Sequence, residues 1–248
     1  SAGAANTLSY LAGQRGRNLR FYTEHLRDPR YLSVRSLVHT GNLFGLQYIY
    51  GTLTNSDGAD PLDYSAVMEN PAEFYMPATD AATGRATYFS KYDIVRDDYR
   101  AVMASCALPG FCRPVKVGDR YYYDGGVADS IPIIRSLKTG HRKNVIILTR
   151  NFGYRKKEGT RGWELYVAAF RKYPNLVRAL VNRAKHYNQV LECIEKWEEE
   201  GSVFVIRPEI PAVSRLEKDE ERLREFYQHG YDQMKANFEA LQEFLKEE

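Results

Sequence analysis

The fold is decided by one stretch of the chain, Tyr121-Tyr122-Tyr123-Asp124-Gly125-Gly126-Val127. Its aromatic residues favour a β-strand, and Asp-Gly-Gly ends that strand sharply because glycine adopts positive φ without steric cost. Together with Arg113–Val117, the segment Arg120–Tyr123 predicts a hairpin that delivers Asp124 at its end. A carboxylate beside a loop without side chains can be approached closely by another backbone or by a ligand. Asp-Gly is also an ordinary turn signal, and that interpretation stays open here.

The chain opens with Ser1-Ala2-Gly3, and the short apolar run Thr7–Leu11 follows. Small residues before an apolar run predict a tight turn that leads into a buried helix. This is the second half of a G-x-S-x-G nucleophile elbow, in which a serine sits at the N-terminus of a helix with its hydroxyl exposed. Ser1 is therefore a candidate nucleophile and Asp124 a candidate general base, although S-x-G alone also fits an ordinary serine.

The segments between these two ends predict an alternation of helices and strands. We expect a mostly irregular or short-helical region over residues 31–70, a hairpin formed by Glu73–Asp80 and Ala86–Ser90, and a helix over Asp97–Cys106. The β-branched run Asn144–Thr149 predicts a strand that is buried on both faces. Helix and buried strand after a hairpin indicate an α/β fold.

The C-terminal half is predicted to be largely helical. Pro174–Glu200 has apolar residues on one face of a long helix, and Val203–Ile206 predicts one further buried strand. One broken helix or two adjacent helices, Leu216–Gly230 and Tyr231–Leu245, should follow. We therefore expect a single domain over residues 1–248, with residues 1–150 as the catalytic core part and 151–248 as a helical tail with one further strand.

Composition excludes several classes of protein. The 248 residues are 44% hydrophobic and 27% charged, typical of a globular domain, and a net charge of only +3 argues against nucleic-acid binding. Residues 135–185 nevertheless hold 14 Lys or Arg against Glu158 and Glu164, a local net charge of +12. This segment predicts peripheral contact with an anionic membrane; a solvated loop and helix face is the alternative.

The three cysteines, Cys106, Cys112 and Cys193, show no metal-binding C-x-x-C spacing. An odd number of cysteines fits a reducing compartment, so we expect a cytoplasmic or membrane-peripheral protein without a metal. No apolar run approaches the ~20 residues of a membrane span. The chain does not begin with Met, so a leader upstream of Ser1 stays open.

Four groups of residues, taken in order, resemble the patatin-like phospholipases, particularly the bacterial members. They are Ser1-Ala2-Gly3; Ala78-Thr79-Asp80 with Thr83-Gly84; Ala104-Ser105-Cys106-Ala107-Leu108-Pro109-Gly110-Phe111; and Asp124-Gly125-Gly126 with Pro132. The resemblance covers roughly residues 1–150 and is looser beyond them. It implies a three-layer α/β/α sheet with a helical C-terminal region.

The resemblance also implies roles for individual residues. Ser1 would be the nucleophile, Asp124 its only partner, and the N–H of Ala2 one oxyanion donor, with Gly3, Gly125 and Gly126 supporting the loops. A Ser-Asp dyad of this kind hydrolyses lipid or small carboxylic esters through an acyl-serine intermediate and needs no cofactor. The glycine-rich oxyanion loop of such enzymes precedes the serine and does not occur in these residues. We therefore expect the 248 residues alone to be nearly inactive, since one lost oxyanion donor costs about 10²–10³ in rate.

Other hypotheses use the same residues differently. Ser1 could serve as an N-terminal nucleophile with its own amine as the base, or the chain could be a non-catalytic module that binds a membrane or a partner. A Ser-His-Asp triad is a further rival, but surface or capping positions are expected for all five histidines: His25, His39, His141, His186 and His229. Of the other carboxylates, we expect Asp80 to organise a turn and Asp129 to cap the helix that begins near Pro132.

Overall fold

The computed structural model describes residues 1–158 and 163–246. The chain divides into two compact units, the first formed by residues 1–130 and 159–183 and the second by residues 131–158 and 184–248. Within the described residues, no helix combines the length and the apolar character that crossing a bilayer requires. Each unit has its own sheet and its own hydrophobic core.

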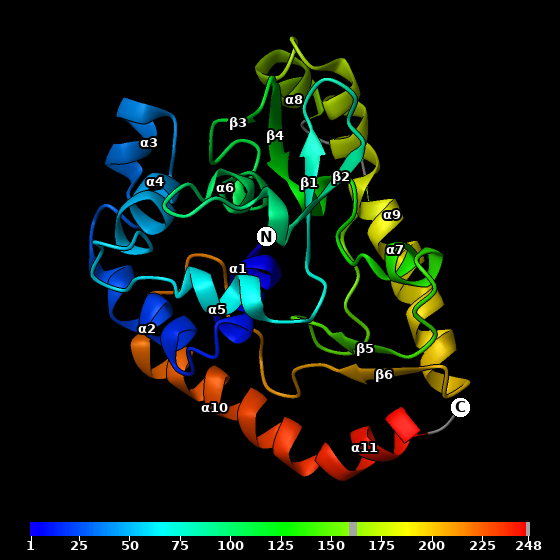
Figure 1. Cartoon of the computed structure of the whole chain (residues 1–248). Helices are drawn as coiled ribbons and strands as arrows, with labels where there is room; N and C mark the ends of the chain where they lie inside the picture. Colours follow the sequence, from blue (N-terminus) through cyan, green and yellow to red (C-terminus); the bar gives the residue numbers. More distant parts are fainter. Residues whose placement is uncertain (159–162, 247–248) are drawn as a thin grey trace. The chain divides into compact units, whose positions relative to one another are not determined.

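The first unit contains a four-stranded antiparallel sheet in the order β2-β1-β4-β3 (Figure 1). Its strands are β1 (Tyr75–Asp80), β2 (Ala86–Ser90), β3 (Val115–Val117) and β4 (Arg120–Asp124). Both predicted hairpins are confirmed, because β1 pairs with β2 and β3 pairs with β4. The two hairpins join where β1 pairs with β4, and this register sets Ala78 opposite Asp124.

Helices cover both faces of this sheet. Tyr122 packs in a core cluster with residues of α1 (Ala2–Leu11), α5 (Tyr64–Glu69) and α6 (Arg100–Cys106). Its neighbour Tyr123 packs instead with Phe170, which follows α8 (Trp163–Ala169), and with the first residues of α9 (Pro174–Glu199). Successive side chains of a strand point to opposite faces, so Tyr122 and Tyr123 mark the two covered faces of β4.

Residues 31–70 form short helices, as predicted. After α2 (Arg17–Thr23) and the 3₁₀ turn His25–Arg27 come α3 (Val34–Thr40), α4 (Leu46–Tyr48) and the π-helix Ile49–Leu53. A separate apolar cluster holds this region together, with Phe21, Tyr31, Leu32, Leu43, Ile49 and Leu53 buried. Two further 3₁₀ turns cover Lys91–Asp93 and Gly125–Val127.

The second unit is built around a two-stranded parallel sheet of β5 (Asn144–Ile147) and β6 (Val203–Ile206). Its helices are α7 (Ile133–Lys138), the remainder of α9, α10 (Glu220–Ala236) and α11 (Phe238–Lys246). The expectation that β5 is buried on both faces is wrong, because Val145 is 41% and Ile147 73% exposed. The face of this sheet that carries Ile146 is the covered one, since Ile146 packs against residues of α7 and α9.

The described residues thus form a mixed α/β structure with a helical C-terminal region, in agreement with the predicted class. The strands lie in two small sheets instead of one continuous sheet. The predicted boundary at Gly230 is also wrong, since α10 continues through that glycine and ends at Ala236. The single-domain prediction stays a prediction.

Candidate active site

Ser1 lies directly before the first turn of α1. Its carbonyl oxygen accepts hydrogen bonds from the N–H groups of Ala4 at 2.9 Å and Ala5 at 3.3 Å. Its side chain is exposed and makes no capping hydrogen bond. The hydroxyl is therefore not engaged by the helix, and the positive end of the helix dipole favours an alkoxide at this position.

Asp124 ends β4, is buried, and is held on three sides. Its Oδ1 accepts a 2.7 Å hydrogen bond from the N–H of Gly126, and its own N–H donates to the Ala107 carbonyl at 2.8 Å. Its carbonyl oxygen accepts from Oγ1 of Thr79 at 2.8 Å. These bonds fix both the strand end and the direction of the carboxylate.

The two glycines after Asp124 are required by close packing. A Cβ on Gly125 would lie 2.1 Å from the Pro77 carbonyl oxygen, and one on Gly126 would lie 2.9 Å from Oδ1 of Asp124. The Gly126 carbonyl is braced by Oγ of Ser130 at 2.7 Å and by Nε of Arg183 at 2.6 Å. Around Gly3, by contrast, no heavy atom comes within 4 Å of an added Cβ.

The two candidate residues are tied to adjacent residues of β1, Ser1 to Pro77 and Asp124 to Ala78. The main-chain nitrogen of Ser1 donates to Oγ of Ser105 at 2.8 Å, and Ser105 donates to the Pro77 carbonyl at 2.7 Å. The next residue, Ala78, pairs with Asp124. Strand alternation puts Asp124 on the same face as Tyr122, the face covered by α1 and α6.

The charge of Asp124 acts on two neighbouring thiols, Cys106 and Cys112. Burial raises the pKa of Cys106; a hydrogen bond with Tyr50 acts in the opposite direction, and the charge of Asp124 adds to the rise. Burial likewise raises the pKa of Cys112 to about 11, and Asp124 contributes to that rise as well.

The rival carboxylates have other partners. Asp80 organises its turn as predicted, since its Oδ1 accepts from the N–H groups of Ala82 and Thr83. The capping prediction for Asp129 is wrong, because no side chain caps α7, and Oδ2 of Asp129 instead accepts from the Tyr88 hydroxyl at 2.5 Å. Tyr88 comes from β2, so a long-range contact has replaced the expected local one.

Four histidines contact residues other than Ser1 and Asp124. His25 Nε2 lies 3.2 Å from Asp60, and His39 Nδ1 lies 2.9 Å from the Arg35 carbonyl. His141 contacts Thr139 and Ser136, and His229 Nε2 accepts from the N–H of Glu209. These four histidines thus bind partners at helix ends, in loops or in one buried ion-pair cluster.

Sequence reasoning missed three residues that hold this arrangement. Ser105 links Ser1 to β1, Thr79 links Asp124 to the N–H of Ala128, and Arg183 braces Gly126 from α9. Ser105 and Thr79 lie inside segments that carried the family resemblance, which was the available signal. Arg183 lies 57 positions from Gly126 along the chain, so no local sequence pattern indicates their contact.

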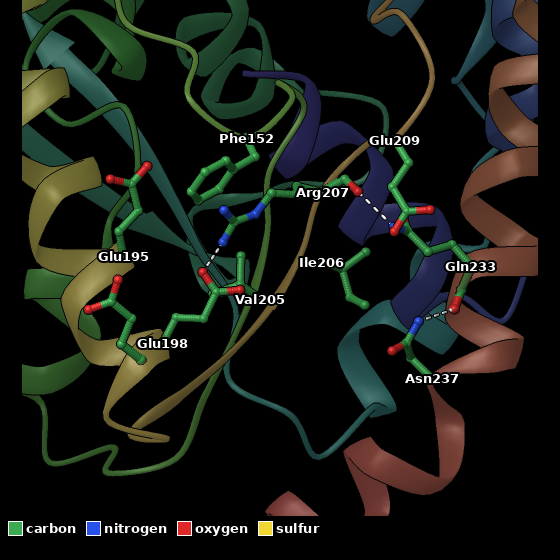
Figure 2. Close-up of a pocket in the computed structure, with 10 residues that line it drawn as sticks. Phe152, Glu195, Glu198, Val205, Ile206, Arg207, Glu209, Gln233 and Asn237 are labelled. Atoms are coloured by element: carbon green, nitrogen blue, oxygen red, sulfur yellow. Dashed lines mark hydrogen bonds and ion pairs between the residues drawn. The ribbon is translucent and has the colours of Figure 1, made fainter.

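A separate cavity of about 430 Å³ lies within the second unit (Figure 2). Glu195 and Glu198 reach into it from α9, and Arg207 lies between them and Gln233. Arg207 is ion-paired with Glu198, and Arg155 with Glu195 at 2.5 Å. Neither Ser1 nor Asp124 lines this cavity.

The basic segment 135–185 is divided between the two units. Several of its cations contact neighbouring side chains: Arg155 pairs with Glu195, Lys156 lies 3.7 Å from the ring centre of Tyr187, and Lys143 lies 4.5 Å from that of Phe244. The predicted membrane contact through this segment stays a prediction.

Comparison with known proteins adds family evidence. The patatin-like phospholipase family matches residues 1–135, more than half of the chain and a range that includes every candidate site residue. A domain of unknown function (DUF6363) matches residues 173–246. The uncharacterized protein YjjU of Escherichia coli (strain K12) is 26% identical over 239 residues, covering 93% of this chain. The chain spans 64% of that relative's length.

Proposed function

The chain belongs to the patatin-like phospholipase family, and from that membership we propose that it is a serine acyl hydrolase acting on lipid esters. Ser1 is the nucleophile and Asp124 the base. The observation that carries the proposal is the shared anchoring of both residues on Pro77 and Ala78 of β1. The three-layer α/β/α sheet and a cytoplasmic, membrane-peripheral location are part of the same proposal.

The reaction proceeds in two steps. Asp124 accepts the proton of the Ser1 hydroxyl as Oγ attacks the ester carbonyl; the C–O bond to the leaving alcohol then breaks, and the alcohol takes that proton. In the second step Asp124 accepts a proton from water, the water oxygen attacks the acyl carbon, and the Ser1–acyl bond breaks with return of the proton to Ser1. The substrate is a carboxylic ester of a lipid or of a small alcohol.

The oxyanion needs main-chain donors. The N–H of Ala2 follows the nucleophile at the start of α1 and is one such donor, because the first N–H groups of a helix have no partner within it. In the resemblance to patatin-like phospholipases, further donors come from a glycine-rich loop that precedes the serine. Activity is therefore measured on the full-length protein.

The two catalytic alternatives fit less well. A triad needs an imidazole between Ser1 and Asp124, whereas His25, His39, His141 and His229 have the other partners described above. An N-terminal nucleophile would use the Ser1 amine as its base and would leave Asp124, which is buried and held by three hydrogen bonds, without a role. A carboxylate base such as Asp124 requires neither an imidazole nor a free amine.

Hydrolysis of a short-chain aryl ester tests the proposal. Ser1→Ala and Asp124→Asn should each lower kcat by about 10³ or more, by analogy with removal of a catalytic nucleophile or its base. Asp129→Asn is the matched control, since it changes a nearby carboxylate that is bound by Tyr88, and it should retain most activity. Retention of activity by Asp124→Asn would overturn the dyad.

A further inference from the structure

Helix α3 exposes apolar side chains to solvent. Val34 is 71% and Val38 78% exposed, and residues four apart share one face of a helix. None of the residues of α3 is buried. Two exposed β-branched residues on one helix face are a small apolar surface that a partner can cover.

A second segment extends this surface. Phe111 is 39% exposed, and its carbonyl accepts a 2.6 Å hydrogen bond from the N–H of Leu43, shortly after α3. The N–H of Arg113 donates to Oδ1 of Asn42 at 2.8 Å. The end of α3 and the loop 111–113 therefore lie side by side, and we refer to Val34, Arg35, Val38, Phe111 and Arg113 as the docking face.

The charge of the docking face is positive. Arg35 and Arg113 are both exposed. Arg30 and Arg100, in the surrounding segments, are ion-paired with Asp28 and Asp98, so the positive charge of the face comes from Arg35 and Arg113. Exposed apolar residues beside arginines, without carboxylates, match an anionic lipid surface, where arginine binds phosphate and the apolar side chains enter the acyl boundary.

The docking face borders the candidate active site. The N–H of Asp124 donates to the Ala107 carbonyl at 2.8 Å, and the next carbonyl, that of Leu108, accepts from the N–H groups of Phe111 and Cys112 at 3.0 and 2.8 Å. The preceding helix, α6, carries Ser105, which binds the main chain of Ser1. A lipid surface held at this face would lie next to the proposed nucleophile and base.

We propose that the docking face binds the surface of an anionic lipid bilayer, with Val34, Val38 and Phe111 inserted at its edge and Arg35 and Arg113 on the headgroup phosphates. This deepens the proposed lipid hydrolysis and rests on it for the substrate. It places membrane contact at α3 and the loop 111–113 instead of at residues 135–185.

Co-sedimentation with vesicles tests the docking face. Full-length protein carrying Ser1→Ala, which keeps the lipid intact, should bind vesicles of phosphatidylglycerol and phosphatidylcholine more tightly than vesicles of phosphatidylcholine alone. Adding Val34→Ser and Val38→Ser should weaken binding by about tenfold through lost apolar burial. Arg35→Gln and Arg113→Gln should each weaken it by roughly fivefold and reduce its salt dependence.

Matched controls distinguish the docking face from the basic segment and from a dimer interface. Leu165→Ser with Val167→Ser removes exposed apolar residues of α8, in the basic segment, and should leave binding unchanged; circular dichroism verifies that every variant is folded. Wild-type binding by the α3 variant, loss of binding only in the α8 variant, or no vesicle binding at all overturns the proposal. A dimer that dissociates on Val34→Ser with Val38→Ser also overturns it, because a second copy would then cover the face.

Hydrolysis of a soluble aryl ester keeps the two proposals apart. The α3 variant in the protein that retains Ser1 should hydrolyse that ester at the wild-type rate while losing activity on vesicles. Failure of the wild-type protein to bind vesicles, with intact ester hydrolysis, contradicts only the further inference. Absence of ester hydrolysis in the wild type, with intact vesicle binding, contradicts only the dyad.

Discussion

The main-chain nitrogen of Ser1 lies 2.8 Å from Oγ of Ser105, a residue 104 positions further along the chain. Ser105 is fully buried on α6 and donates in turn to the Pro77 carbonyl. These two hydrogen bonds hold the start of α1 in place beside strand β1. Strand β1 also pairs with β4, the strand that ends at Asp124. Ser105 is thus a positioning residue, because it acts through the main chain of Ser1.

Ser105→Ala should lower kcat for aryl ester hydrolysis about tenfold with little change in KM. The substitution removes a hydrogen-bond donor to the partly buried Pro77 carbonyl, an effect that typically costs about 1–3 kcal/mol of stability, and it frees the Ser1 main chain. Steady-state kinetics and thermal unfolding measure the two effects separately. Ser136→Ala, which removes the 2.6 Å hydrogen bond to Asn144 in the second unit, is the matched control and should leave kcat unchanged. A loss of kcat of similar size in the control would refute the positioning role.

Gly125→Ala should destabilise the protein and abolish activity, because the added methyl group would lie 2.1 Å from the Pro77 carbonyl oxygen. Relieving such a contact requires backbone movement, with a typical cost of about 1–3 kcal/mol or more. Gly3→Ala has open space and lies within α1, so it should be neutral or stabilising by up to about 1 kcal/mol. Chemical denaturation measures both; equal stability of the two variants would contradict the packing described for Gly125.

The local features of the fold were predictable from sequence, whereas the partners were not. Asp-Gly-Gly predicts its turn because the conformational freedom of glycine is a local property, and both hairpins of the first unit follow from short-range patterns. The strand at Asn144 was predicted to be buried on both faces because a continuous apolar run carries no information on sheet size. Its sheet has two strands, so Val145 and Ile147 remain exposed.

Long-range contacts account for the other differences between the sequence-based predictions and the structure. The Ser105 bond to Ser1 and the Arg183 bond to Gly126 join distant segments, and neither leaves a periodic signal. Asp129 was predicted to cap a helix, but Tyr88 from β2 offered a stronger partner. Gly230 was predicted to end a helix, yet glycine inside a helix costs only about 1 kcal/mol, and the packing of α10 tolerates it.

Asp60 should control acid stability. Burial alone would raise the pKa of this carboxyl, but hydrogen bonds from Arg20 and His25 and the charge of Arg17 lower it on balance. A lowered pKa stabilises the folded state above the unfolded value of about 3.9, and that contribution is lost as pH falls through the folded value. Asp60→Asn should therefore destabilise the protein at pH 7 by about 3 kcal/mol, because Arg17 stays buried without its counter-charge.

Urea denaturation between pH 3 and pH 7 measures this dependence. The stabilities of wild type and Asp60→Asn should converge toward the acid end of the range. Asp28→Asn, which breaks a pair with the exposed Arg30, should cause a much smaller loss. A constant difference between wild type and Asp60→Asn across the whole range would contradict the role of the Asp60 charge.

Replacement of His25 should leave catalysis intact, because its ring nitrogen contacts Asp60 and not the candidate pair. His25→Gln should keep kcat within about twofold of the wild type. The pH–rate profile should also lack a limb near about 6.5, where an unperturbed histidine titrates. Stopped assays from pH 5 to pH 9 measure both features. A histidine variant as damaging as Ser1→Ala would restore the triad.

The most direct test of the Ser1–Asp124 dyad is to find the residue that a fluorophosphonate modifies in the full-length protein. Peptide mass spectrometry should place the phosphonyl group on Ser1, and Asp124→Asn should slow the labelling by about 10³ because Ser1 then lacks its base. Labelling of another residue, or undiminished labelling of Ser1 in Asp124→Asn, would contradict the dyad.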